Sequence, residues 1–329
     1  MNEERYRKLL SALRKYLDVV EVKMSAKKWG QITYENVPSR ANLIYNNAFL
    51  RNDEERRHDY LNALERGETK INSSVLFPHD IVHKYGASHY GLKPKDTALE
   101  AMWNALPDIV NGNGNTIVVA DGSGSMEIGV GGISVTALSV ANALAIYFAE
   151  RSTGQFKDMY ITFSDRPQLV DFNKCISLRE KIEVALRHSE VANTNIDAVF
   201  DLILKTAISK RMKQSELPQN ILIVSDMEFD SCVSTNATVG GCGREVISPK
   251  LFDTIAAKYT QHGYRLPRLV FWNVNSRTGT VPVMENDLGV VLVSGFSVNI
   301  VKMILSGKTD PYECLVEQLM SERYAKITI

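Results

Sequence analysis

The sequence predicts an α/β fold: a doubly wound, mostly parallel sheet with one antiparallel edge strand, preceded by an all-α amino-terminal region. From about residue 115, short β-branched apolar runs alternate with stretches of helical periodicity, which is typical of a parallel sheet covered by helices. These runs are continuously apolar, so we expect strands that are buried on both faces. Before this point the chain shows helical periods without a strand pattern. We therefore expect a helical region over residues 1–110 and an α/β domain over residues 111–329.

The amino-terminal region contains the signals of at least four helices. The first is expected over residues 3–19, where leucines recur at helical spacing. Ser39 and Asp53 are candidate N-caps for two further helices. Thr97 with Glu100 forms a candidate capping box for a fourth.

The second half predicts strands and helices in alternation, with one hairpin at residues 164–167. The expected strands cover residues 117–120, 160–163, 168–170, 221–224, 269–272 and 290–293. The expected helices cover residues 134–150, 178–186 and 196–208, with two more opening at Pro249 and at Asp310. Because ligands of doubly wound folds bind beyond the carboxyl ends of the strands, the functional residues should lie there.

Composition narrows the class of protein. The chain has 329 residues, enough for two units, and its 44% hydrophobic and 23% charged content is typical of a globular protein. Its 38 basic and 38 acidic residues cancel, so no global field favours nucleic acid. The four cysteines form no C-x-x-C pair, the start is charged, and no apolar stretch is long enough to span a bilayer. We expect a cytoplasmic protein that does not enter a membrane.

The most specific motif lies directly after the first predicted strand. Asp121, Ser123 and Ser125 alternate with glycines there, so a carboxylate and two hydroxyls can converge on one point. Two more oxygen donors, Thr194 before a helix and Asp226 at the end of a strand, should reach the same edge of the sheet. A ligand set made only of oxygen suits a hard divalent cation: Mg²⁺ first, with Ca²⁺ and Mn²⁺ as alternatives.

These five positions resemble the metal-ion-dependent adhesion site of the von Willebrand factor A family. Its motif is D-x-S-x-S, then a threonine before a helix, then an aspartate at the end of the fourth strand, and the order and strand context agree here. The resemblance covers about residue 115 to the carboxyl terminus. It implies that both serines and one or two of Asp121, Thr194 and Asp226 ligate the ion directly, the others acting through water.

The charge of this ligand set favours binding over catalysis. Hydroxyls carry no formal charge, so only Asp121 and Asp226 offset the charge of the dication. The ion therefore keeps much of its Lewis acidity and favours a further acidic ligand. We therefore expect a non-enzymatic module that captures an acidic group of a protein partner. A dinucleotide site is disfavoured because Glu127 occupies the third glycine position, and a phosphatase because Ser123 stands where a second acid is normal. A plain serine–glycine turn that caps a helix is the structural alternative.

The amino-terminal half resembles the helical region that precedes the A-domain in Ro/TROVE-related proteins, most closely an uncharacterised TROVE-like family. The segments that carry this resemblance are Trp29, residues 38–41, residues 49–53, Tyr60-Leu61, Gly67 and residues 76–81. In Ro proteins, helical repeats form a ring that binds misfolded and small non-coding RNAs. This chain departs from the pattern, because it has too few helices before residue 115 for a ring. Residues 1–90 hold fifteen Lys and Arg against twelve Asp and Glu, which a solvated helical surface also produces.

The alternatives to partner binding are therefore a Ro-like ribonucleoprotein component that contacts RNA through the helical region, and a metal-dependent hydrolase. The hydrolase would need a general base near Asp121 that the sequence does not reveal. His79 and His83 lie four residues apart and could share a zinc ion on one helix face, but we favour helix capping and packing as their role.

Overall fold

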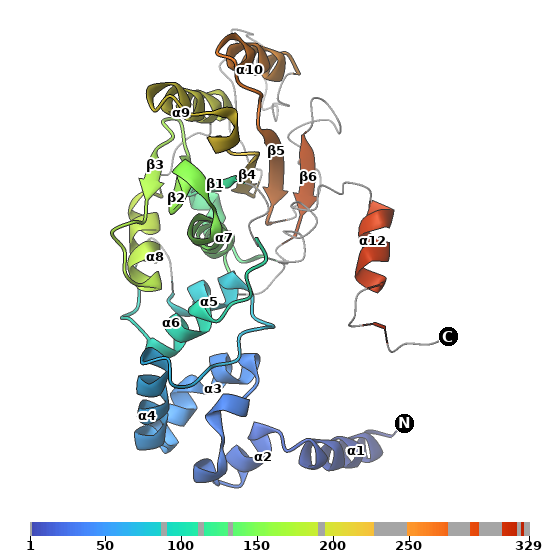
Figure 1. Cartoon of the computed structure of the whole chain (residues 1–329). Helices are drawn as coiled ribbons and strands as arrows, with labels where there is room; N and C mark the ends of the chain where they lie inside the picture. Colours follow the sequence, from blue (N-terminus) through green and yellow to red (C-terminus); the bar gives the residue numbers. More distant parts are fainter. Residues whose placement is uncertain are drawn as a thin grey trace. The chain divides into compact units, whose positions relative to one another are not determined.

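The computed structural model describes residues 2–86, 91–110, 115–130, 134–189, 195–226, 249–275, 290–295, 311–320 and 324–325 (Figure 1). The chain divides into two compact units, and each is described by itself. The first comprises Met1–Phe77 and Pro94–Pro107, and the second comprises Pro78–Lys93 and Asp108–Ile329. The segment Pro78–Lys93, which precedes part of the first unit in sequence, thus belongs to the second by its contacts.

The first unit is helical. Its three central helices, α3, α4 and α6, contact one another. Its elements are α1 (Glu3–Tyr16), α2 (Val20–Ser25), η1 (Trp29–Gln31), η2 (Tyr34–Asn36), α3 (Ser39–Asn52), α4 (Glu54–Glu65) and α6 (Thr97–Asn104). α1 ends three residues before the expected limit, because Asp18 adopts a left-handed conformation with φ of 47°.

A buried arginine, Arg57 of α4, organises the core of this unit. Its guanidinium donates hydrogen bonds to Asn46 Oδ1 at 2.8 and 3.2 Å and to Asn42 Oδ1 at 3.3 Å. The same group lies over the rings of Tyr34, Phe49 and Tyr60, with centroids 4.9 to 5.3 Å away. The charge is thus held by amide oxygens and aromatic faces from the surrounding helices.

Of the predicted caps of this unit, Asp53 is confirmed at an N-cap position, whereas Ser39 and Thr97 are not N-caps. α3 begins at Ser39 itself, with Pro38 in the capping position. Asp53 does occupy the N-cap of α4, but it caps no backbone N–H, because its carboxylate accepts hydrogen bonds from Tyr34 and Arg56. The cap of α6 is Asp96, which accepts from two backbone N–H groups at 2.8 and 3.1 Å. An aspartate caps at least as well as the threonine beside it, so the predicted Thr97 box does not form.

The second unit confirms the predicted α/β class. Six strands form one sheet in the order β3-β2-β1-β4-β5-β6, in which only β2 and β3 pair antiparallel. Its strands are β1 (Thr116–Asp121), β2 (Met159–Phe163), β3 (Leu169–Asp171), β4 (Asn220–Ser225), β5 (Arg268–Asn273) and β6 (Val291–Ser294). Its helices are α5 (Pro78–Lys84), η3 (Gly124–Glu127), α7 (Ala137–Arg151), η5 (Gly154–Phe156), α8 (Leu178–Arg187), α9 (Ile196–Ser209), η6 (Gln214–Glu216), α10 (Pro249–Gln261) and α12 (Pro311–Leu319).

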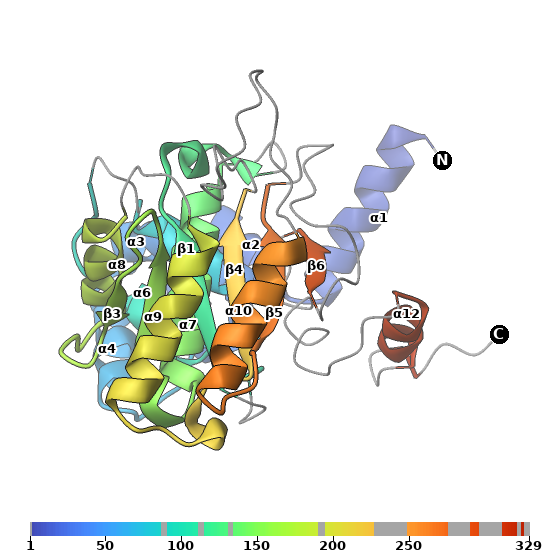
Figure 2. The same ribbon diagram turned by 90° about the horizontal axis from the view of Figure 1, so that it is seen from above.

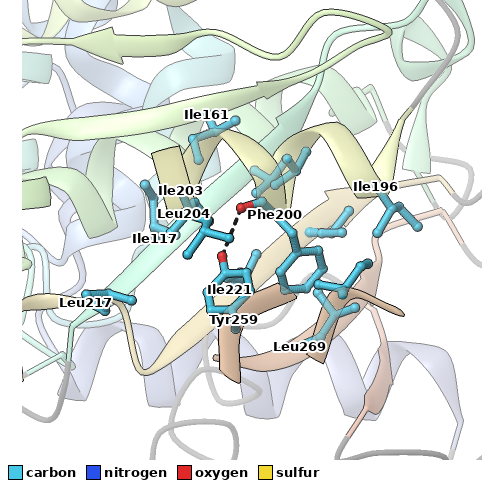
Figure 3. Close-up of a cluster of buried hydrophobic side chains, with 14 of the residues drawn as sticks. Ile117, Ile161, Ile196, Phe200, Ile203, Leu204, Leu217, Ile221, Tyr259 and Leu269 are labelled. Atoms are coloured by element: carbon cyan, nitrogen blue, oxygen red, sulfur yellow. Dashed lines mark hydrogen bonds between the residues drawn. The ribbon is translucent and has the colours of Figure 1, made fainter. Parts of the chain in front are cut away.

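One face of the sheet packs against α9 and α10 (Figure 2). Alternate strand residues such as Ile117, Ile161, Ile221 and Leu269 meet apolar side chains of these helices in a fully buried cluster (Figure 3). The Tyr259 hydroxyl, deep in this cluster, donates to the backbone oxygen of Phe200 at 2.9 Å. The buried polar tip is thereby satisfied, and the two helices are joined.

The other face is covered by α7, which packs against β1 and β2. All thirteen residues from Ala137 to Ala149 are buried, because α5 and α8 pack against α7 in turn. The helix starts at Ala137, later than expected, since the Thr136 hydroxyl accepts from the Ser139 N–H and caps it. In the described parts of the chain, no helix combines the length and the apolarity that crossing a bilayer requires.

Candidate functional site

The site lies where the chain reverses its direction of winding across the sheet. From β1 the chain proceeds outward to β2 and β3, then returns to β4 on the other side of β1 and continues to β5 and β6. β1 and β4 therefore flank the switch point, beyond whose carboxyl ends such folds bind ligands. β1 ends at Asp121, and β4 ends at Ser225 with Asp226 following. Two of the predicted ligands thus follow from topology alone.

Asp121 is buried, and each of its carboxylate oxygens accepts a hydrogen bond. The backbone N–H of Ser123 donates to Oδ1 at 2.8 Å, and the Ser225 hydroxyl donates to Oδ2 at 2.6 Å. The parallel register of β1 and β4 places Ser225 beside Asp121. The side chain is therefore held in one orientation from both strands of the switch point.

Ser123 and Ser125 lie in the turn that follows β1. Their hydroxyl oxygens are 3.0 Å apart, within hydrogen-bond distance, and both side chains are partly accessible to solvent. The 3₁₀ turn η3, which begins at Gly124, folds the chain back so that the two hydroxyls converge. The motif thus places two neutral oxygen donors at the surface beside the buried carboxylate.

Gly122 is required by a close approach of another segment. A Cβ at this position would lie 2.7 Å from Cα and 2.8 Å from Cβ of Ser189, closer than real atoms tolerate. Ser189 follows α8, and the chain continues from there towards α9. Ser189, at the end of this described stretch, therefore packs directly against the turn that follows β1.

The electrostatics of the two aspartates fit a bound cation. Burial raises the pKa of Asp121, the nearby Asp226 carboxylate raises it further, and the hydrogen bonds from Ser225 and Ser123 oppose this. Asp226 is itself buried. Among the described residues, no lysine, arginine or histidine forms an ion pair with Asp121. Two neighbouring buried carboxylates are costly unless a positive charge joins them, and a divalent cation supplies one.

The structure brings together four of the five predicted ligands at this edge: Asp121, Ser123, Ser125 and Asp226. Thr194 lies outside the described residues, so its place in the set stays a prediction. Over the described chain no three His, Cys, Asp or Glu side chains gather at one point. The candidate site depends instead on hydroxyl oxygens beside two carboxylates, which suits a hard cation.

Sequence reasoning missed several polar residues at the same edge. Ser225 shares a row across the sheet with Asp121 and with Asn273 at the end of β5. Asn273 Oδ1 accepts from the backbone N–H of Asn275 at 3.0 Å, and Ser164, just after β2, is buried. The signal that could have revealed them is strand register, since each lies at the carboxyl end of a strand next to the motif.

The two histidines singled out as a possible zinc pair both lie on α5. His79 is buried, whereas His83 is half-buried, with Nε2 3.3 Å from the Ser134 hydroxyl. Ser134 belongs to the segment between the metal motif and α7. Burial and the nearby Lys84 and Lys93 lower the pKa of His83. His83 thus connects α5 with the segment that precedes α7.

Fold and site together define a doubly wound α/β protein with an oxygen-rich edge at its switch point, joined to a helical unit. The chain belongs to the family described as Domain of unknown function (DUF7788), whose sequence model matches residues 115–326. A second family model, Domain of unknown function (DUF2828), matches residues 2–116. The two matches meet at residues 115–116, and the predicted division at residue 110 stays a prediction.

Among curated proteins, the chain is similar to an uncharacterized protein of Acanthamoeba polyphaga mimivirus. The two are 31% identical over 325 residues, which is 94% of this chain and 53% of the viral protein. The chain therefore spans about half the length of this relative.

Two solved structures are also similar. The Ro (RSR) protein of Deinococcus radiodurans aligns with a TM-score of 0.44 and 18% identity, over 85% of this chain and 50% of that one. Proximal thread matrix protein 1 from the mussel byssus aligns with a TM-score of 0.33 and 12% identity, over 61% of this chain and 48% of that one. At these scores neither likeness bears on function.

Proposed function

We propose that this protein is a non-enzymatic binding module, in which a divalent cation at the carboxyl edge of β1 and β4 captures an acidic group of a protein partner. The observation that carries the proposal is the pair of buried carboxylates, Asp121 and Asp226, beside two accessible hydroxyls. Mg²⁺ is the proposed ion, with Ca²⁺ and Mn²⁺ as alternatives, because hard cations prefer oxygen donors. The scattered cysteines favour a cytoplasmic setting.

The ligand set supports binding rather than hydrolysis. Ser123 and Ser125 would hold the ion through neutral oxygens, with Asp121 and Asp226 balancing its charge directly or through water. Both oxygens of Asp121 already accept hydrogen bonds. This carboxylate would therefore neutralise less of the charge of a bound cation. When bound, the cation would supply a position that attracts another carboxylate. Ser123 and Ser125, being partly accessible, leave that position open to a partner.

Calorimetric titration with Mg²⁺, Ca²⁺ and Mn²⁺ tests the first step. We expect wild type to bind one ion, and Asp226→Asn and the double variant Ser123→Ala/Ser125→Ala to lose at least tenfold in affinity. Asp165→Asn is the matched control: it removes an exposed carboxylate just beyond β2, and its affinity should equal that of wild type. Equal metal affinity in all four proteins would refute the site.

The second step is partner capture on immobilised protein, with and without a chelator. Capture through the metal should vanish with EDTA and in Asp226→Asn, persist in Asp165→Asn, and depend only modestly on salt. A partner held equally well in EDTA would contradict the proposed mode of binding.

The same proteins separate the two alternative functions. RNA contact through the helical unit should weaken steeply with salt and survive Asp226→Asn, because it depends on phosphate neutralisation. A hydrolase should turn over p-nitrophenyl phosphate in a metal-dependent manner, and we expect no turnover. Either of those results, in place of metal-dependent capture, would overturn the proposal.

A further inference from the structure

Two connections meet at the amino-terminal edge of the sheet, opposite the edge that carries the candidate cation site. Residues 210–219 lead from α9 into β4, and residues 262–267 lead from α10 into β5. Figure 2 shows α9 and α10 side by side on one face of the sheet. Because β4 and β5 pair in parallel, both connections enter the sheet at the same edge.

Hydrogen bonds fix the two connections against each other. The Tyr264 hydroxyl donates to the backbone oxygen of Met212 at 2.7 Å, and the backbone N–H of Arg265 donates to Gln214 Oε1 at 2.7 Å. Lys213 lies between the two anchored residues of the first connection. Lys213 and Arg265 therefore belong to one continuous surface.

This surface concentrates positive charge. Four basic side chains on the two connections, Lys210, Arg211, Lys213 and Arg265, are exposed, and we call them the basic edge. In the part of the chain that the structure describes, none of the four forms an ion pair. The whole chain has 38 basic and 38 acidic residues, so the excess is local and does not follow from the overall composition.

The acidic residues near this surface are few, and they interact with other groups. Neither residues 202–215 nor residues 254–284 include an aspartate or a glutamate. Asp201 forms ion pairs with one lysine of α9 and one of α10. The Glu216 carboxylate accepts a hydrogen bond from the backbone N–H of Lys213 at 2.6 Å. The basic edge therefore keeps its charge available for an external anion.

Helix capping explains only part of this charge. A basic residue near the carboxyl end of a helix interacts favourably with the helix dipole, which accounts for Lys210, the C-cap of α9, and for Arg211 beside it. It does not account for Lys213, which lies beyond the last turn, or for Arg265 on the other connection. Basic residues that gather from separate elements, without acidic partners, are typical of a surface that binds a polyanion.

We propose that the basic edge binds the phosphate backbone of a nucleic acid, without reading its sequence. Protein–protein interfaces are depleted in lysine and centre on aromatic and apolar anchors. Over residues 210–219 and 262–267, all of which the structure describes, no large apolar side chain is exposed, and the adjoining turn of α9 adds only Ile208, at 41%. Phosphates are instead contacted by lysine and arginine, and by amides such as the exposed Gln214 and Gln219.

Fluorescence anisotropy of the full chain with a labelled oligouridylate of about 20 nucleotides tests the proposal. EDTA is present throughout, so that no cation can hold a phosphate at the opposite edge of the sheet. We expect a Kd on the order of 10 µM at physiological salt. The slope of log affinity against log salt concentration should be roughly −3, because four phosphate contacts contribute about −0.7 each. An oligothymidylate of the same length should bind equally well, since the contacts are to phosphate.

The variant Lys210→Gln/Lys213→Gln/Arg265→Gln removes three of the four charges. Arg211 is kept, because its backbone is left-handed, with φ of 52°, and a substitution there would disturb the turn. Affinity for both oligonucleotides should fall at least tenfold, and the salt slope should become shallower by about 2, since three phosphate contacts are lost. Urea denaturation should match that of wild type, because the replaced side chains are exposed.

The matched control, Lys28→Gln/Arg166→Gln/Lys174→Gln, lowers the net charge by the same amount. Its three side chains are exposed, lie outside the two connections and form no ion pair with any described residue. Its affinity and its salt slope should equal those of wild type. Asp226→Asn should also bind both oligonucleotides as wild type does, so that failure of the cation site leaves this inference untouched.

Three results would overturn the inference. One is a wild-type protein that binds neither oligonucleotide at low salt; co-sedimentation with vesicles that contain phosphatidylserine would then assign the basic edge to a membrane surface. Another is equal affinity of the two triple variants, which would assign binding to net charge or to another surface, such as that of the helical unit. The third is a tenfold preference for one of the two oligonucleotides, which would contradict recognition through the phosphate backbone.

Discussion

The two units of this protein bury charge in different ways. In the helical unit, the guanidinium of Arg57 is enclosed by amide oxygens of Asn42 and Asn46 and by three aromatic rings. In the α/β unit, the carboxylates of Asp121 and Asp226 are both buried, and the charge of Asp226 adds to the effect of burial in raising the pKa of Asp121. The arginine charge is surrounded by neutral acceptors and aromatic rings, whereas the two carboxylates bring charges of the same sign near one another at one edge of the sheet.

This difference separates a structural charge from a functional one. A buried ion that the fold surrounds with complementary groups stabilises the native arrangement only while every partner is present. Buried charges of the same sign raise the energy of the native state unless a ligand of opposite charge binds between them. Asp121 and Asp226 lie at the switch point, which is where this class of sheet binds its ligands. The comparison predicts opposite responses to neutralising the two kinds of charge.

The largest effect is expected at Arg57. Arg57→Met should lower the free energy of unfolding of the helical unit by about 2–6 kcal/mol, because it leaves the buried amide oxygens of Asn42 and Asn46 without their donor. Arg51→Met, which removes one exposed hydrogen bond on α3, is the control and should change little. Urea denaturation measures both. A loss under about 1 kcal/mol for Arg57→Met would show that the caged charge does not organise the unit.

The opposite response is expected at Asp121. Asp121→Asn removes one of two like charges, and its amide can still accept from the Ser123 N–H and donate to Ser225. Without metal the variant should therefore be at least as stable as wild type. In wild type, Mg²⁺ at 100 times Kd should add about 2.7 kcal/mol to the free energy of unfolding, and the variant should lose this gain.

Thermal unfolding with EDTA and with Mg²⁺ gives both values, with Asp165→Asn as the control that keeps the gain. If Asp121→Asn destabilised the metal-free protein by several kcal/mol, the carboxylate would be structural, and the contrast between the units would fail.

A smaller effect is expected at Gly122. Gly122→Ala places a Cβ 2.7 Å from the Ser189 backbone, so either the motif turn or the segment after α8 must shift. We expect a loss of about 1–3 kcal/mol in the α/β unit, together with weaker metal binding. Gly30→Ala in the helical unit is the matched control, because its Cβ would meet nothing closer than Arg56 Nη1 at 3.9 Å. Unchanged stability and unchanged metal affinity in Gly122→Ala would show that this close approach does not shape the site.

The sequence predicted the α/β unit well because its signals are local. Continuous apolar runs marked every strand that the structure describes. Because a doubly wound sheet binds its ligands at the carboxyl ends of its strands, Asp121 and Asp226 could be assigned to one edge before the structure placed them near each other. The roles that the sequence could not predict depend on strand register and on packing. Ser225 became visible as the partner of Asp121 only when β1 and β4 were aligned, and Gly122 only when Ser189 was placed beside it.

In the helical unit the local signals were less complete. Asp53 occupies the predicted N-cap position of α4, but its carboxylate accepts hydrogen bonds from Tyr34 and Arg56 and caps no backbone N–H. Arg57 lies in a run of charged residues that is typical of a solvated surface. Its burial comes from the packing of α3, α4 and α6. Propensity ranks each residue alone, whereas tertiary contacts decide which competing partner wins.

The smallest effect tests to which unit α5 belongs. Its position in the sequence suggests the helical unit, whereas its packing assigns it to the α/β unit. Burial lowers the pKa of His83, so the folded state prefers the neutral imidazole. The unfolded state, with a pKa of about 6.5, binds more protons as the medium is acidified, and stability is therefore full above that pH and falls below it. His83→Gln keeps a polar group near Ser134 but cannot titrate. The stability advantage of wild type over His83→Gln should thus shrink steadily from pH 8 to pH 5, while the titration of all other groups cancels in the difference.

Hydrogen exchange should place the change in peptides of α5 and α7. A difference that stays constant with pH, or that appears in peptides of α3 and α4, would return this helix to the first unit.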